Sequence, residues 1–184
     1  FTGRRARGLF VEYEVTKKQC WARLASTFSN ERDWASIEID GQLLPETEVE
    51  MDQLAKDLKI VEMWTIEEVV RAMRNYDFLV IDYIQLTPGE TTDARTNVER
   101  NMKILSKLRM EQGKIIFVIS TMPRAAYDKE DISVFKESGN VEFAIQSGFL
   151  LTALNPGIAE RMIKVSVLKN TRGPVGESFW LEGS

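Results

Sequence analysis

The sequence contains no histidine, and Cys20 is its only cysteine. A single cysteine excludes an internal disulfide bond, and without histidine the chain has no cluster of soft metal ligands. Mechanisms that need an imidazole, such as the cysteine–histidine, serine–histidine and zinc mechanisms, are therefore excluded. Chemistry that uses oxygen ligands and magnesium remains open.

Long apolar runs are also missing. No stretch of eighteen apolar residues occurs, so the sequence predicts no membrane-spanning helix. The opening segment, FTGRRARGLF, lacks the apolar stretch of a signal peptide. We therefore expect a cytoplasmic protein without a membrane partner.

What is present is an ordinary globular composition. The chain has 184 residues, of which 43% are hydrophobic and 28% are charged. This length suits one domain with a core of its own, and we see no repeat, low-complexity tract or linker. The sequence predicts a single domain over residues 1–184.

The net charge of −4 is unevenly distributed. Between Asp33 and Glu68 there are eleven acidic residues and two basic ones. Such an acidic block is typical of a solvated face. The chain is not a basic nucleic-acid coat protein, so any contact with DNA must come from local loops.

The most informative stretch is FLVIDYIQL, residues 78–86. Four apolar residues lead into Asp82, which is typical of a buried parallel strand that ends in a carboxylate at the ligand-binding edge of the sheet. In nucleotide-hydrolysing folds of the P-loop kind, an aspartate there holds magnesium. An aspartate that only caps a core strand is the alternative. Gln85, two residues beyond the apolar strand end, is positioned to reach the cleft or the next subunit.

Strand and helix patterns alternate along the chain, which predicts an α/β fold with a parallel sheet. Thr16, Pro45, Thr65 and Gly113 provide the helix start and stop signals. The three strand-like runs near the end have no helices between them, so we expect antiparallel additions at one end of the sheet. The predicted strands cover residues 9–15, 60–63, 78–81, 114–120, 149–154, 162–168 and 177–181, and the predicted helices cover 16–29, 45–58, 94–112 and a segment that begins at 65. We expect the first strand to leave the core at Glu12 and Glu14, and the strand over 114–120 to be buried on both faces. The predicted apolar stripes are Cys20, Leu24 and Phe28 in the helix over 16–29, and Val98, Met102, Leu105 and Leu108 in the helix over 94–112.

VIDYIQL resembles the Walker B segment of the hexameric replicative DNA helicases of the DnaB type, a branch of the RecA-like ATPases. The order of parts is similar to that of the helicase motor over nearly the whole chain. The resemblance implies an α/β RecA-like three-layer sandwich, with a mostly parallel central sheet and antiparallel strands at its C-terminal edge. It also implies that Asp82 binds the magnesium ion of an ATP complex.

Two further segments carry the resemblance at the expected catalytic centre. GLFVEYEVT, residues 8–16, resembles the strand with a Ser-Leu-Glu-Met signature and places Glu14 at the glutamate that polarises the attacking water. VISTMPR, residues 118–124, stands where the family has Ser-Gln, and here Thr121 replaces the γ-phosphate-sensing glutamine. With Gln85, Thr121 would relay the nucleotide state, through a side chain with a shorter reach than that of glutamine.

FKESGNVE, residues 135–142, resembles the family's Arg-Glu-Ser-Gly-Ala-Ile-Glu segment beside the channel that grips single-stranded DNA. Arg124, Lys129 and Lys136 would then contact DNA phosphates, and the alternative is that they are solvated loop charges. KNTRGPVG, residues 169–176, resembles a turn whose lysine and arginine reach the neighbour's triphosphate. Lys169 matches the lysine, whereas Arg172 is displaced by one position.

The sequence contains no G-x-x-x-x-G-K-[ST] phosphate-binding loop. In the family, this loop and its helix precede the strand that begins here at Leu9. We therefore expect either the downstream part of a larger polypeptide or a relative that has lost its grip on the nucleotide.

The function that the resemblance implies is the ATP-dependent motor domain of a hexameric replicative DNA helicase. ATP and Mg²⁺ would be its cofactors, and single-stranded DNA, further copies in a ring and other replication proteins would be its partners. Two alternatives remain open. One is a recombinase-type or clock-type RecA relative, and the other is a non-hydrolysing RecA-like module for assembly or DNA binding.

Overall fold

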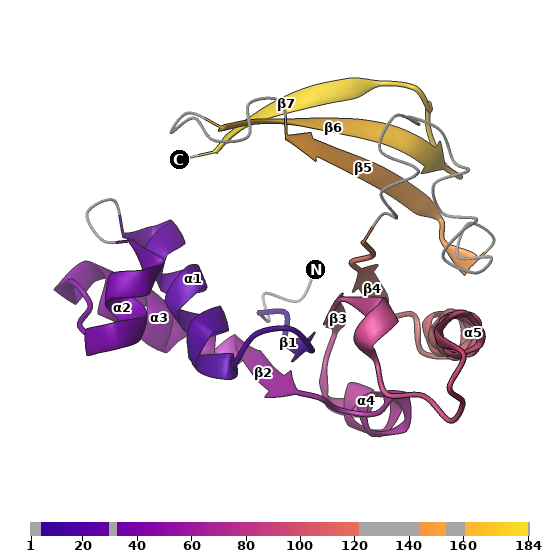
Figure 1. Ribbon diagram of the computed structural model, residues 1–184, viewed down its shortest axis with the longest axis horizontal. Helices are drawn as coiled ribbons and strands as arrows, with labels where there is room; N and C mark the ends of the chain where they lie inside the picture. Colours follow the sequence, from indigo (N-terminus) through magenta and orange to yellow (C-terminus); the bar gives the residue numbers. More distant parts are fainter. Residues whose placement is uncertain (1–4, 30–32, 122–143, 154–160, 184) are drawn as a thin grey trace. The chain divides into compact units, whose positions relative to one another are not determined.

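The computed structural model describes residues 5–29, 33–121, 144–153 and 161–183 (Figure 1). The chain divides into two compact units, Phe1–Thr121 and Met122–Ser184, which we describe one after the other. The single domain over residues 1–184 stays a prediction. No helix in the described ranges is long and apolar enough to cross a membrane.

The first unit is built on a four-stranded parallel sheet with the order β2-β1-β3-β4. Its strands are β1 (Gly8–Glu12), β2 (Leu58–Glu62), β3 (Phe78–Asp82) and β4 (Ile115–Val118). β3 lies between β1 and β4, which confirms the predicted interior strand that ends at Asp82. Successive parallel strands need crossover connections, and helices supply them here.

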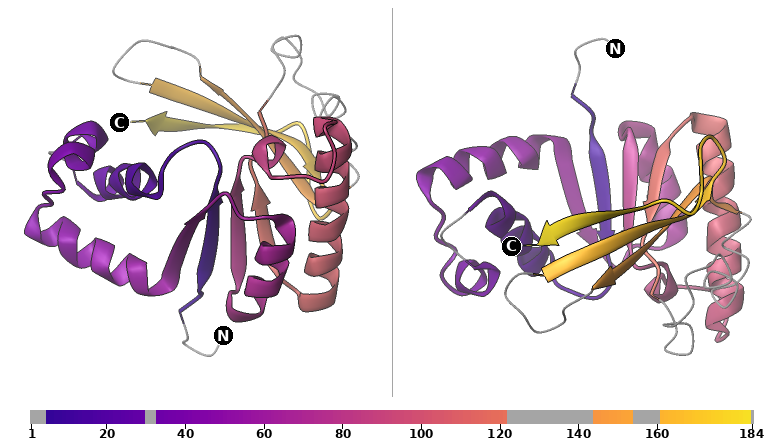
Figure 2. Two further views of the ribbon diagram at one scale, coloured as in Figure 1. Left: turned by 60° about the horizontal axis from the view of Figure 1, so that its bottom comes forward. Right: turned by 90° about the horizontal axis from the view of Figure 1, so that it is seen from above.

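One face of this sheet forms the core of the unit. Leu9 pairs with Leu79 and Val11 with Ile81, and all four side chains are 0% exposed. Helices α4 (Ile66–Ala72) and α5 (Ala94–Gln112) lie along the sheet (Figures 1 and 2). Their buried residues include Ile66, Val69, Val98, Met102, Leu105 and Leu108. The apolar stripe predicted for the helix over 94–112 is thus confirmed.

The helix boundaries follow the signals read from the sequence. Thr16 and Thr65 form capping boxes at the starts of α1 (Lys17–Phe28) and α4. α3 (Pro45–Asp57) starts with proline at its first turn, and Gly113 ends α5 in the left-handed conformation with φ 63°. These local signals are strong because they satisfy backbone groups that a helix end leaves free.

Three short helices complete the first unit. They are α2 (Trp34–Asp40) and the 3-10 helices η1 (Met73–Asn75) and η2 (Ile84–Leu86). α2 is absent from the sequence prediction, and it changes the packing of α1. The predicted stripe that ended at Phe28 is wrong at that residue, which is 46% exposed. Instead, α1 packs through its alanines with α2 and α3, in a cluster of Ala22, Ala25, Ile37 and Met51.

The strand over residues 114–120 differs from its prediction. We expected it to be buried on both faces, but Ile115 and Phe117 of β4 are 61% and 57% exposed. The physical reason is that side chains alternate between the two faces of the strand: Ile115 and Phe117 share the exposed face, while Ile116 and Val118 are half-buried on the other. An apolar run alone does not distinguish an outer strand from an inner one.

The second unit contains an antiparallel sheet of β5 (Ser147–Ala153), β6 (Arg161–Asn170) and β7 (Ser178–Gly183), in that order. The antiparallel arrangement is confirmed. The strands form a separate sheet, however, and not an extension of the parallel one. Each pairs with the strand next to it in sequence, the simplest pairing when no helix intervenes. The chain as a whole has the expected α/β fold class.

Candidate active site

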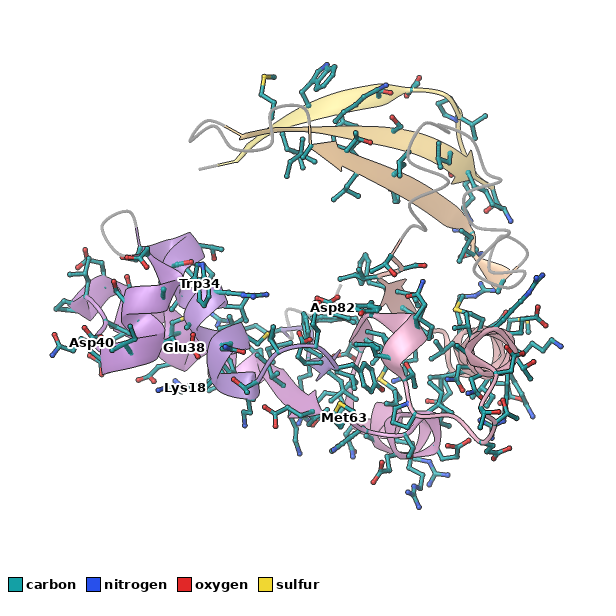
Figure 3. All side chains as sticks on the ribbon, in the orientation of Figure 1. Lys18, Trp34, Glu38, Asp40, Met63 and Asp82 are labelled. Atoms are coloured by element: carbon teal, nitrogen blue, oxygen red, sulfur yellow. The ribbon has the colours of Figure 1, made fainter. Side chains whose placement is uncertain are left out.

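Three strands of the parallel sheet end in a carboxylate at the same edge. Glu12 ends β1 and Glu62 ends β2. Asp82, labelled in Figure 3, ends β3. Glu12 is in register with both of the others. Because the carboxyl ends of parallel strands meet at one edge, the sheet itself gathers this acidic row where α/β folds bind ligands.

Glu12 is the most buried member of the row, at 3% exposure. Its Oε1 accepts hydrogen bonds from the backbone N–H groups of Tyr13, Glu14 and Val15, with distances of 3.1, 2.9 and 3.2 Å. Our expectation that the strand leaves the core at Glu12 is therefore wrong. A buried carboxylate is tolerated when several N–H groups satisfy it, and here those groups also fix the turn that carries Glu14.

Asp82 is half-buried, and its carboxyl lies near other negative charges, whereas that of Glu12 is satisfied by N–H donors. Burial raises the pKa of its carboxyl above the ordinary value, and the negative charges of Glu12 and Glu14 raise it further, while Arg23 lowers it. The Asp82 carbonyl accepts the Tyr13 N–H at 2.9 Å, and the Asp82–Tyr83 peptide bond is cis. Glu14, the proposed water-polarising residue, is exposed beside this pair.

The negative field reaches the first turns of α1. The pKa of the Cys20 thiol is raised to about 11, first by burial and then by the charges of Glu12 and Asp82. A thiol with a raised pKa carries little thiolate at neutral pH, so Cys20 is an inert core residue. Nearby carboxylates help to raise the pKa of both the Asp82 carboxyl and the Cys20 thiol, which identifies this edge as a region with excess negative charge.

Tyr13 ties the edge to the loop that precedes α4. Its hydroxyl donates to the carbonyl of Trp64 at 2.6 Å. Burial is the main reason that the pKa of Tyr13 is raised to about 12, with a hydrogen bond to Thr87 acting against it and Glu68 acting with it. Tyr13 is thus a neutral, fixed part of the wall behind the acidic row.

Gln85 and Thr121, two residues with a predicted role in relaying the nucleotide state, are in contact. Gln85 Nε2 donates to Ser120 Oγ at 2.8 Å and to the Thr121 carbonyl at 3.1 Å. The Thr121 N–H is 3.4 Å from Gln85 Oε1. The link connects the segment after β3 with the segment after β4. It uses the backbone of Thr121, which leaves the threonine side chain outside these bonds.

The acidic row can be tested for its fit to a divalent cation. Among the described residues, no group of three or more His, Cys, Asp and Glu side chains is arranged to hold a metal. Magnesium in nucleotide sites, however, needs only one or two carboxylates besides phosphate and water. Asp82 meets that requirement, because its burial beside Glu12 and Glu14 leaves negative charge that a cation would neutralise. The printed sequence offers no phosphate-binding loop to complete a nucleotide site.

The remaining predicted site residues lie elsewhere. Lys169 belongs to β6, and Arg172 follows in the turn, where its N–H donates to Asn170 Oδ1 at 3.1 Å. Both are in the second unit, and their role toward a neighbouring subunit stays a prediction. Arg124, Lys129 and Lys136 lie outside the described residues.

Glu12 is the residue that the sequence analysis missed as part of the site. A signal was available, since GLFVE, LKIVE and FLVID are five-residue strands that each end in an acid. Only the last was interpreted as a site, because its apolar run was the clearest. Comparison of the three strand ends would have predicted the whole row.

No protein-family model matches the sequence, and no curated protein matches it. Solved structures do match. A DnaB-like replicative helicase, whose structure was described with its interactions with primase, superposes with a TM-score of 0.73 and 16% identity. A KaiC-like protein, PH0186 from Pyrococcus horikoshii OT3, superposes with a TM-score of 0.61 and 17% identity over 96% of this chain and 70% of its own.

The match to the helicase covers 95% of this chain and 48% of the helicase chain, so this chain spans about half the helicase's length. At these identities the likeness concerns the fold. It agrees with the α/β class and the parallel sheet described above. The chain therefore shares the α/β fold of the DnaB-like helicase and of the KaiC-like protein, which is the RecA-like fold that the sequence resemblance implied.

Proposed function

We propose that this chain is the motor domain of an ATP-dependent replicative DNA helicase that forms a hexameric ring and translocates on single-stranded DNA. The observation that carries the proposal is the half-buried Asp82, whose charge is opposed by Glu12 and Glu14 at the ligand-binding edge of a RecA-like sheet. Like charges held close together and partly buried at one sheet edge are a costly arrangement for a purely structural domain. The shared fold with a DnaB-like replicative helicase supports the same interpretation.

The residues of this chain take separate roles in the proposed site. Asp82 would hold Mg²⁺, which when bound supplies positive charge to a transferring phosphoryl group. Glu14 would accept a hydrogen bond from the attacking water and orient it. Glu12 positions Glu14, because it binds the backbone of the turn on which Glu14 stands. Gln85 would link the site to Thr121 and to the segment that follows.

Contacts beyond the first unit complete the proposal. Arg124, Lys129 and Lys136 would bind the phosphates of single-stranded DNA. Lys169 and Arg172 would act on the triphosphate of a neighbouring subunit in the ring. The helicase with the same fold was described with its interactions with primase, and we propose other replication proteins as partners here.

A second candidate is a RecA-like module for assembly or DNA binding that does not hydrolyse ATP. The observation that favours it is the absence of a G-x-x-x-x-G-K-[ST] segment from the printed sequence. A recombinase-type or clock-type relative is a further alternative within the enzymes, and the shared fold with a KaiC-like protein is compatible with it.

The deciding experiment measures Mg²⁺-dependent ATP hydrolysis, with and without single-stranded DNA, by residues 1–184 and by the polypeptide made from the natural coding region. We expect hydrolysis wherever a phosphate-binding segment is present, and its loss in Asp82→Asn. If neither form binds nucleotide while both still assemble or bind DNA, the motor proposal fails and the non-hydrolysing module replaces it.

A further inference from the structure

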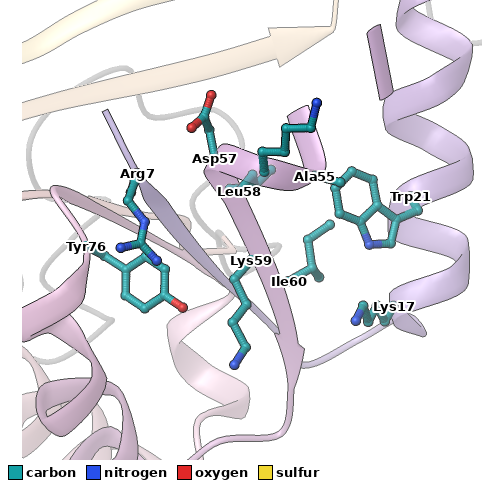
Figure 4. A pocket seen from close by; sticks show the side chains of 10 residues that line it. Arg7, Lys17, Trp21, Ala55, Asp57, Leu58, Lys59, Ile60 and Tyr76 are labelled. Atoms are coloured by element: carbon teal, nitrogen blue, oxygen red, sulfur yellow. The ribbon is translucent and has the colours of Figure 1, made fainter. Parts of the chain in front are cut away.

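A hollow of about 420 Å³ lies beside β2, the outer strand of the parallel sheet (Figure 4). The start of α1 contributes Lys17 and Trp21, and the end of α3 contributes Lys56. Lys59 comes from β2 itself, and the segments just before β1 and β3 add Arg7 and Tyr76. Five segments of the first unit thus converge on this one surface.

The hollow is strongly basic although the chain as a whole is acidic. Four cationic side chains line it: Arg7, Lys17, Lys56 and Lys59. Over the described residues, none of these four forms an ion pair. The one carboxylate in the lining, that of Asp57, forms an ion pair with Arg5 outside the hollow, with 3.5 Å between Oδ2 and Nη1. The carboxylates of Asp77 and Glu62 border the hollow at the backbone of Arg7 and Lys17, so its four cations outnumber the three carboxylates that line or border it.

Aromatic rings stand among these cations. The Arg7 guanidinium carbon lies 5.4 Å from the centre of the Tyr76 ring. Lys59 Nζ lies 5.6 Å from the centre of the Trp64 ring, next to the hollow. These cation–π contacts hold the charged groups in place while their other hydrogen-bond donors stay available. Trp21 adds a third, half-buried ring on the side of α1.

The backbones that carry two of the cations are fixed as well. The Arg7 N–H donates to Asp77 Oδ2 at 2.8 Å, and its carbonyl accepts the N–H groups of Asp77 and Phe78 at 2.7 and 3.3 Å. The Lys17 N–H donates to Glu62. A fixed backbone lowers the entropy that a ligand must remove on binding, so these cations are partly preorganised for an anion.

We propose that this hollow binds single-stranded nucleic acid, with phosphates on the four cations and bases against Trp21 and Tyr76. Cations supply attraction to phosphate, and aromatic rings supply stacking on unpaired bases, the combination that single strands require. A duplex offers no free base faces to such rings.

An extended ligand also fits the arrangement. In Figure 4, β2 runs between Arg7, Lys59 and Tyr76 on one side and Lys17 and Trp21 on the other. A ligand that contacts both groups must pass over the strand, as a chain of nucleotides can and a single phosphate cannot. This contact is separate from the acidic edge and from the proposed DNA contacts of Arg124, Lys129 and Lys136.

The test measures binding of a fluorescein-labelled oligothymidylate to residues 1–184 by anisotropy, over a series of salt concentrations without ATP or magnesium. The test variant is Lys17→Ala with Lys59→Ala, and its control is Lys103→Ala with Lys107→Ala, two exposed lysines of α5. With about 0.7 units of salt slope per phosphate contact on a single strand, the test variant should reduce the slope by about 1.4. We also expect its affinity to fall about tenfold at low salt, while the control changes by less than about twofold.

Two further arms distinguish binding in the hollow from binding by the loop cations and from binding of acidic peptides. The triple variant Arg124→Ala, Lys129→Ala, Lys136→Ala tests the loop contacts of the proposed function. We expect it to retain substantial binding of oligothymidylate. Quenching of tryptophan fluorescence by unlabelled oligothymidylate should diminish in Trp21→Phe. The inference is overturned if the Lys17 and Lys59 variant behaves like its control. It is also overturned if polyglutamate displaces the oligonucleotide as well as unlabelled oligothymidylate does, since the hollow would then bind acidic peptides.

Discussion

The carboxyl edge of the parallel sheet and the hollow beside β2 hold opposite charges by different means. At the edge, Glu12 is buried and satisfied by three backbone N–H groups, and Asp82 stands next to it with a raised pKa. In the hollow, Arg7 and Lys59 are exposed and lie over aromatic rings. The difference indicates how each charge can be used. A buried acid needs the fold to compensate it, whereas an exposed cation over a ring remains ready for a ligand.

The largest expected effects come from replacing, one at a time, the exposed Glu14 and the buried Glu12. In the form that hydrolyses ATP, Glu14→Gln should lower kcat by about 10²-fold or more, because the water loses its base. Its unfolding free energy should hardly change, since Glu14 is exposed. Steady-state hydrolysis and urea unfolding check both expectations. Equal rates in the variant and the wild type would remove Glu14 from the site.

Glu12→Ala should have the converse effect on residues 1–184. It leaves one buried and two part-buried N–H groups without their acceptor, and we expect a loss of about 2 kcal/mol of unfolding free energy. Urea unfolding followed by circular dichroism measures it, with Glu14→Ala as the control. If both variants lose the same small amount, Glu12 does not hold the turn and the contrast between the two acids is lost.

Ligands should stabilise the two regions independently. At ten times its Kd, a ligand adds about 1.4 kcal/mol to the unfolding free energy. Magnesium should stabilise the wild type and the Lys17, Lys59 double variant, but not Asp82→Asn. Oligothymidylate should stabilise Asp82→Asn and lose its effect in the double variant. Thermal unfolding with each ligand measures this, and loss of both responses in one variant would contradict two separate sites.

Gln85→Ala should cost about 1 kcal/mol, because it removes hydrogen bonds to Ser120 and to the Thr121 carbonyl in a half-buried place. Urea unfolding gives the value. Thr121→Ala is the matched control and should be nearly silent, since Gln85 contacts the backbone of that residue. A larger cost for Thr121→Ala would mean that its side chain has a role beyond these hydrogen bonds.

The last expected effects are confined to the extremes of pH. The pKa of Tyr13 is raised to about 12 in the folded state, so its contribution to stability is complete below pH 10 and is lost as the pH rises toward 12. For Asp82 the pKa is also raised, so its contribution is complete below about pH 4 and declines as pH rises. Tyr13→Phe should flatten the alkaline loss, and Asp82→Asn should flatten the acidic one. Unfolding free energies across pH measure both, and unchanged slopes would contradict the raised values.

Much of this fold could be predicted because the deciding signals are local. The capping boxes at Thr16 and Thr65 and the stop at Gly113 satisfy backbone groups a few residues away, and their patterns can be identified in any sequence. The site was predictable in part, because the apolar strand before Asp82 is unusually clear. Glu12 was missed because its burial depends on three N–H groups of a turn whose path only the folded chain determines.

The basic hollow was beyond prediction for a different reason. Its cations come from four segments between Arg7 and Lys59, and the stretch from Asp33 to Glu68, which supplies two of them, is acidic on average. The local charge composition of the sequence therefore predicts a negative surface where the folded chain has a positive one. Only the convergence of α1, α3 and β2 brings the lysines together.

The two outer strands of the first unit also differ in how well they resist unwanted association. β2 carries Lys59 and Glu62, exposed charges that discourage a foreign strand from pairing along it. β4 carries Ile115 and Phe117, both more than half exposed and without a charge between them. If chains of the isolated first unit aggregate on concentration or heating, β4 is the strand along which they should join.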